Sequence, residues 1–85
     1  MTTLHPHRAY NITKRAVNEI DPIGLLALGA PPDEYTPEIR DIAEPVLNDR
    51  LTLDAVRGVF WHWFAMHVPR PIIRQIIELI TRELS

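Results

Sequence analysis

Residues 21–37 read DPIGLLALGAPPDEYTP, the most distinctive stretch of the chain. This stretch holds four of the eight prolines and two of the three glycines, around one isoleucine and three leucines. Proline and glycine interrupt regular helices, whereas a solvated linker would not carry so many large apolar side chains. The sequence therefore predicts a packed, structured loop over residues 21–35.

An amphipathic helix is predicted immediately before this loop. Over residues 7–20 the apolar side chains recur at helical spacing, at Ala9, Ile12, Ala16 and Ile20. The helix should end at Asp21, because the residue before a proline is pushed out of the α region. We expect Asp21 to cap a further short helical piece that runs through Leu28 and stops at Gly29.

A second helix is predicted directly after the loop. Thr36 supplies a capping hydroxyl, Pro37 suits the first helical position and Glu38 adds favourable negative charge there. Pro45 falls inside the same apolar pattern and should kink or stop the helix. The sequence leaves open whether the helix continues to Asn48.

The third predicted helix, residues 53–67 after a Thr52 cap, is apolar on nearly every side. A helix of this kind is buried nearly all round. It is therefore expected either to be the central helix of the molecule or to be partly covered by another chain.

A last helix follows the break at residues 68–71, with isoleucines spaced three and four apart rather than two. No strand pattern is present. The 85 residues are enough for one hydrophobic core and no more. The predicted fold is thus all-α: one domain, residues 1–85, built as a small bundle of four helical segments with a structured proline-rich loop after the first helix.

Residues 18–25 (NEIDPIGL), followed by APPDEY at residues 30–35, resemble a family of small bacterial proteins of unknown function found in Bacillus-type genomes. Members show NEWDPIGL, then DEY, then a Pro-Glu-Ile helix start. This chain departs from that pattern by carrying Ile20 in place of the aromatic residue. The resemblance covers residues 10–42 and implies a compact all-α domain with no established activity; small proteins of this general kind also occur as immunity partners beside secreted toxins.

Charge is unevenly distributed along the chain, although the formal net charge is only -2. Residues 19–49 contain eight acidic side chains and a single basic one, Arg40, while both flanking regions are net basic. An acidic region of this kind is either an ordinary solvated face or a surface that steers and binds a basic protein.

Several kinds of chemistry find no support in the sequence. There is no cysteine, and His62 and His67 are five positions apart, unlike the four-residue spacing of a zinc-binding helix. No nucleophile–base order, nucleotide motif or phosphate-binding glycine loop is present. We therefore expect no enzyme activity, no metal and no cofactor.

Nucleic-acid and membrane binding are not expected either. The sequence pI of about 6.0 is too low for the basic footprint of a nucleic-acid-binding protein. The N-terminus lacks the apolar run of a signal peptide, and the longest apolar region, residues 53–68, is too short and too charged to span a bilayer. The expected location is the cytoplasm.

The first functional hypothesis is a small non-enzymatic protein-binding module of the immunity or antitoxin type. It would bind a basic protein partner, such as a toxin, through the acidic side chains Asp33, Glu34, Glu38 and Asp41. Trp61 is either a core residue or an anchor of the interface, since tryptophan is frequent at binding hot spots. The alternative is a homodimeric structural protein that self-associates through residues 58–68.

Overall fold

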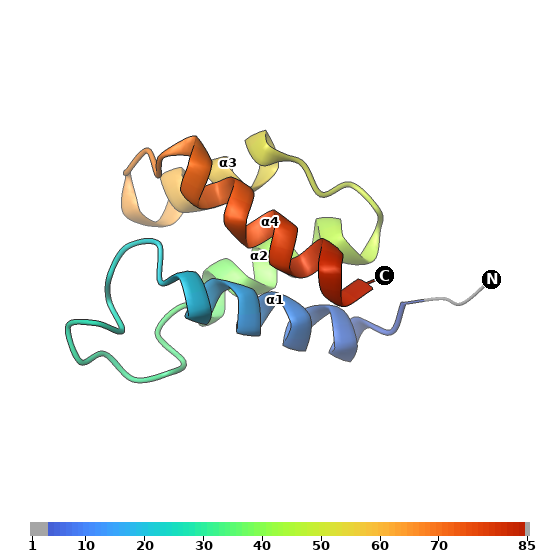
Figure 1. The fold of residues 1–85 in the computed structure, drawn as a ribbon, viewed down its shortest axis with the longest axis horizontal. Helices are drawn as coiled ribbons and strands as arrows, with labels where there is room; N and C mark the ends of the chain where they lie inside the picture. Colours follow the sequence, from blue (N-terminus) through green and yellow to red (C-terminus); the bar gives the residue numbers. More distant parts are fainter. Residues whose placement is uncertain (1–3, 85) are drawn as a thin grey trace.

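The computed structural model describes residues 4–84 and confirms the all-α class (Figure 1). Its four helices are α1 (Pro6–Ile20), α2 (Thr36–Leu47), α3 (Leu53–Phe64) and α4 (Arg70–Leu84), and this described part contains no strand. The radius of gyration, 12.0 Å, equals the value of about 12 Å expected for a single compact domain of this length.

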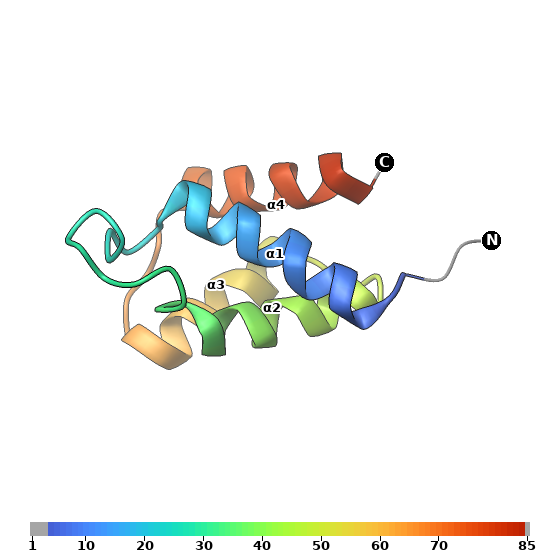
Figure 2. The same ribbon diagram turned by 90° about the horizontal axis from the view of Figure 1, so that it is seen from below.

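The four helices form an antiparallel ring in which each helix packs against two others. The packed pairs are α1 with α2, α2 with α3, α3 with α4, and α4 with α1. Figures 1 and 2 show successive helices running in alternating directions, so that α1 begins and α4 ends at one end of the molecule. The loop between α1 and α2 lies at the opposite end, together with the end of α3.

The core is built from the apolar stripes of all four helices. Each stripe follows the helical period, so a helix can bury one side and leave the other in water. The largest fully buried side chains are Ile12, Thr13 and Val17 of α1, Tyr35 just before α2, Ile39 and Ile42 of α2, Val56 and Phe60 of α3, and Ile73, Ile76 and Ile80 of α4.

The expectation that the third helix is central is wrong. Only Val56 and Phe60 of α3 are buried, whereas Trp61, Trp63 and Met66 are about half exposed. In a ring of four helices every helix has an outer side, and α3 makes no close backbone contact with α1 across the ring. Trp61 and Trp63 therefore lie on the surface, whereas Leu53, Val59 and Phe64 are partly buried against the core.

Two expected helix boundaries also differ from the structure, and one boundary that the sequence left open is now defined. Thr36 is the first helical residue of α2 and not its cap; its hydroxyl donates to the carbonyl oxygen of Asp33 at 2.6 Å. Helix α2 continues through Pro45 to Leu47, which settles the question that the sequence left open. Helix α3 ends at Phe64, three residues early, because Ala65 adopts a left-handed conformation with φ 52°.

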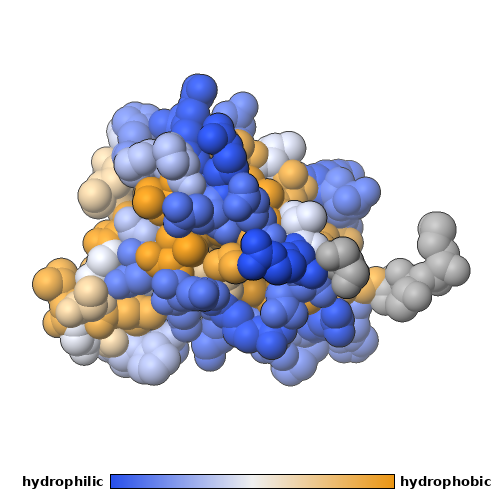
Figure 3. All heavy atoms as spheres, viewed as in Figure 1, coloured by the Kyte–Doolittle hydropathy of each residue, from blue (hydrophilic) through white to orange (hydrophobic). Residues whose placement is uncertain are grey.

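Apolar residues on the side shown in Figure 3 gather at the end that carries the loop between α1 and α2. Leu28, in this loop, is the most exposed large apolar residue of the described chain, at 84%. No helix within residues 4–84 is long and apolar enough to cross a bilayer.

Candidate protein-binding surface

Asp21 organises the loop that follows α1. Its backbone is left-handed, with φ 50°, and ends the helix by donating its amide to the Val17 carbonyl oxygen. The carboxylate accepts hydrogen bonds from the amides of Leu26 at 3.0 Å and Ala27 at 2.9 Å. Burial alone would raise the pKa of Asp21, but these hydrogen bonds and one from Tyr35 outweigh burial and lower that pKa.

Tyr35 fixes the other end of the same loop. Its ring is fully buried, and its hydroxyl donates to the Asp21 carboxylate at 2.6 Å. The same hydroxyl accepts from the amides of Ile23 at 3.1 Å and Leu25 at 3.4 Å. Burial, followed by the hydrogen bond to Asp21, raises the pKa of Tyr35 to about 12. Two side chains 14 positions apart thus bind four backbone amides of the loop.

These contacts replace the short helix that was expected after Asp21. Residues 22–28 form turns rather than a helix, and Gly24 and Gly29 take positive φ values of 80° and 97°. Asp21 acts on amides five and six positions ahead, beyond the reach of an N-cap. The result is a fixed loop that holds Leu28 in solvent.

The predicted acidic residues divide into three that are exposed and one that is not. Asp33 and Glu34 are exposed in the last turn of the loop, and Asp41 is exposed on α2. Glu38, in the first turn of α2, is only 3% exposed. The structure therefore leaves Asp33, Glu34 and Asp41 on the surface and removes Glu38 from it.

Glu38 is a buried acid without a complete set of hydrogen bonds. Its Oε2 atom has no hydrogen-bond partner within the described residues. Burial raises the pKa of Glu38, and the neighbouring negative charges of Asp41 and Glu34 raise it further. Its role is thus internal, and it cannot form a surface ion pair with a partner.

The two tryptophans of α3 lie on different sides of that helix. The Trp63 indole donates to the Asp41 carboxylate at 2.7 Å and so joins α3 to α2. Trp61, two positions earlier and about 200° around the helix, stacks on the His67 ring with centroids 4.5 Å apart. Asp41 and Trp63 therefore belong to one surface, and Trp61 to another.

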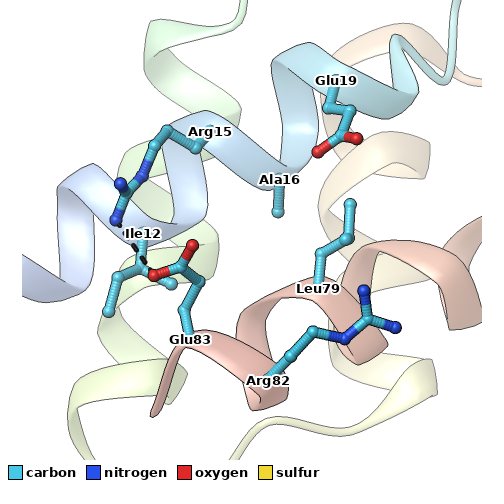
Figure 4. A pocket seen from close by; sticks show the side chains of 7 residues that line it. All are labelled: Ile12, Arg15, Ala16, Glu19, Leu79, Arg82 and Glu83. Carbon is cyan, nitrogen blue, oxygen red and sulfur yellow. Dashed lines mark hydrogen bonds and ion pairs between the residues drawn. The ribbon is translucent and has the colours of Figure 1, made fainter.

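A shallow pocket of about 210 Å³ lies between α1 and α4 (Figure 4). Its polar rim consists of Arg15, Glu19, Arg82 and Glu83, over an apolar floor. Arg15 and Glu83 already form an ion pair at 3.3 Å. The pocket is smaller than the roughly 300 Å³ at which small-molecule sites begin, and its two signs of charge are already balanced within the chain.

Residues 4–84 contain no group of three or more histidine or acidic side chains placed to hold a metal ion. No protein-family model, curated protein or solved structure matches the chain. The resemblance of residues 10–42 to a bacterial family thus stays a prediction. The loop and the neighbouring side of α2 remain the best-defined candidate site.

Two members of this surface were not identified from the sequence. Leu28 is expected to pack within the structured loop, but it is 84% exposed. The sequence leaves open whether Trp63 is a core or an interface residue. No local sequence signal marks either residue, because the exposure of each depends on how the loop and α3 pack in the folded chain.

Proposed function

We propose that this chain is a cytoplasmic, non-enzymatic protein-binding module that acts as immunity or antitoxin proteins do and binds a basic protein partner. The observation that carries the proposal is the fixed loop over residues 21–35. Hydrogen bonds of Asp21 and Tyr35 hold its backbone, while Leu28 is 84% exposed in the same loop as Asp33 and Glu34.

A loop of this kind is well suited to binding. Because its backbone is already ordered, little conformational entropy is lost when it docks. Leu28 offers an apolar side chain to a pocket of the partner, and Asp33 and Glu34 attract basic side chains around it. Asp41, held by Trp63, extends the negative charge along α2.

Charge reversal tests the electrostatic half of the proposal. We would measure, at low salt, binding of the chain to the product of the neighbouring gene. The variant D33K/E34K should weaken binding at least tenfold and slow association. The matched control E19K/E78K makes the same change in net charge at exposed positions of α1 and α4 and should leave binding nearly unchanged. Equal affinities of the two variants would refute the proposal.

The apolar half is tested at Leu28. The substitution L28S removes the exposed side chain, should keep the fold, and should weaken binding about tenfold through faster dissociation. Leu84, exposed by 42% near the opposite end of the molecule, supplies the control L84S. Absence of any complex with the neighbouring gene product would also contradict the proposal.

A second candidate function is self-association into a structural homodimer. The observation in its favour is the outer side of α3, where Trp61 is 50% exposed. Since Trp61 and the Asp41–Trp63 pair lie on different sides of α3, a dimer and a basic partner would use different surfaces.

A further inference from the structure

The outward face of α3, defined here as Asp54, Gly58, Trp61 and His62, carries polar atoms that have no hydrogen-bond partner within residues 4–84. All four residues are exposed. Neither the Asp54 carboxylate nor the Trp61 indole N–H makes a hydrogen bond or ion pair with any other residue of the described range. Gly58 lies between them, and a Cβ atom built there would meet nothing within 4 Å.

Water hydrates these exposed groups in a single chain, where they are too far apart to hydrogen-bond to one another. Asp54 and Trp61 are seven positions apart, which places them about 10 Å apart along the helix axis. The Asp54 carboxylate, a hydrogen-bond acceptor, thus lies at one end of the face. Trp61 and His62, which can donate hydrogen bonds, lie at the other end, and Gly58 lies between the two ends.

We propose that a second copy of this chain covers the outward face of α3, with the two α3 helices antiparallel and crossing at Gly58. In a two-fold symmetric interface, residues at equal distances on either side of the crossing point meet each other. Asp54 and His62 are each four positions from Gly58. Asp54 of one copy therefore lies beside Trp61 and His62 of the other, and the same contacts form twice.

The shape of the face fits the same arrangement. The distance between two packed helices depends on the side chains where they cross, and glycine allows the closest approach. Close approach at Gly58 covers the exposed half of both Trp61 rings, whose other surface stacks on His67. The inference specifies the interface of the second candidate function and does not depend on the loop that binds the basic partner.

Analytical ultracentrifugation of the full chain over a wide concentration range provides the test. The parent chain should show a reversible monomer–dimer equilibrium. The substitution G58Q adds a long polar side chain at the crossing point and should weaken the dimer at least tenfold. Because glutamine favours helix more than glycine does, the monomer should stay folded. A strictly monomeric parent chain, or a dimer unaffected by G58Q, would overturn the proposal.

A charge exchange tests the antiparallel register. D54K places a lysine beside Trp61 and His62 of the other copy, so that donors face donors. H62E places a glutamate beside Asp54 of the other copy, so that two acids face each other. Each single substitution should weaken the dimer. The double variant D54K/H62E should restore it, because Lys and Glu then meet across the interface in both copies. Residues 54 and 62 are about 12 Å apart along one helix, so restoration cannot arise within a chain. Failure of the double variant to exceed both single variants would overturn the register.

A final comparison separates the two proposals. The loop variant D33K/E34K should leave the monomer–dimer equilibrium unchanged, whereas G58Q should leave binding of the basic partner unchanged. Loss of both properties in either variant would show that one surface serves both, contrary to the inference.

Discussion

Two residues, Asp21 and Tyr35, determine the conformation of the longest loop. They are distant in sequence, yet the Tyr35 hydroxyl both donates to the Asp21 carboxylate and accepts from two loop amides. Removal of a buried hydroxyl that takes part in three hydrogen bonds lowers the free energy of unfolding, because the groups around it lose their partner and remain away from water.

Replacement of this hydroxyl gives the first prediction. Y35F should lower the free energy of unfolding by about 1–3 kcal/mol, the cost of leaving buried polar groups unsatisfied. Urea unfolding followed by circular dichroism measures this change. Tyr10 is half-buried and makes no described hydrogen bond through its hydroxyl, so Y10F is the matched control and should be nearly neutral. Similar losses in both variants would contradict this account of the loop.

Glu38 gives a prediction about pH. Burial, and then the charges of Asp41 and Glu34, raise its pKa above the ordinary value of 4.5, so the folded state holds the proton more tightly than the unfolded state does. The stability contributed by Glu38 must therefore fall as the pH rises from the ordinary pKa of the unfolded state through the raised pKa of the folded state. E38Q should be more stable than the parent chain at neutral pH, with the difference disappearing in acid.

The control for Glu38 is Glu78, an exposed acid of α4. E78Q should change neither the stability nor its dependence on pH, measured by thermal unfolding between acid and neutral pH. If E38Q instead destabilises the protein at neutral pH, the ionised Glu38 carboxylate is stabilised by its surroundings and the assigned direction of its pKa is wrong.

At the scale of single elements, the two threonines near helix starts behave differently. The Thr52 hydroxyl accepts from the Ala55 amide at 3.1 Å and so caps α3, whereas the Thr36 hydroxyl donates to a carbonyl oxygen and caps nothing. T52A should therefore cost about 1 kcal/mol of unfolding free energy, measured in urea, and T36A clearly less. Equal costs would show that the hydroxyl of Thr36 also supports its helix.

The elements themselves could be predicted from the sequence because helical spacing is a local property. The start of α3 after Thr52 and the end of α1 before Asp21 were predicted for the same reason, since each depends on a short-range contact. The end of α3 was missed because alanine, not glycine, takes the left-handed conformation at position 65. Nothing in the local sequence distinguishes that alanine from a helical one.

The candidate site was only partly predictable for a different reason. Asp33, Glu34 and Asp41 lie on the surface as expected of acids, but the burial of Glu38 depends on how other elements pack around α2. The exposure of Trp61 has the same origin. A nearly all-apolar helix predicts burial only if neighbours surround it, and the ring leaves α3 with one open side.

For the whole molecule, the ring means that the core depends on every helix. Ile80 of α4 is fully buried and lies on the helix that closes the ring against α1. I80A should cost about 2–5 kcal/mol, a large part of the roughly 5–15 kcal/mol available to a small domain. Half-buried Ile72 on the same helix provides the control, and I72A should cost distinctly less. Thermal unfolding distinguishes the two, and equal costs would contradict the described core.

The alternating helix directions have a practical consequence. Because α1 starts and α4 finishes at the end remote from residues 21–35, a tag, a fluorescent label or a fused domain joined at either terminus is held away from Leu28, Asp33 and Glu34 (Figures 1 and 2). The chain can thus be anchored to a sensor surface from its amino or its carboxyl side with the loop still accessible, and the two orientations should report the same affinity.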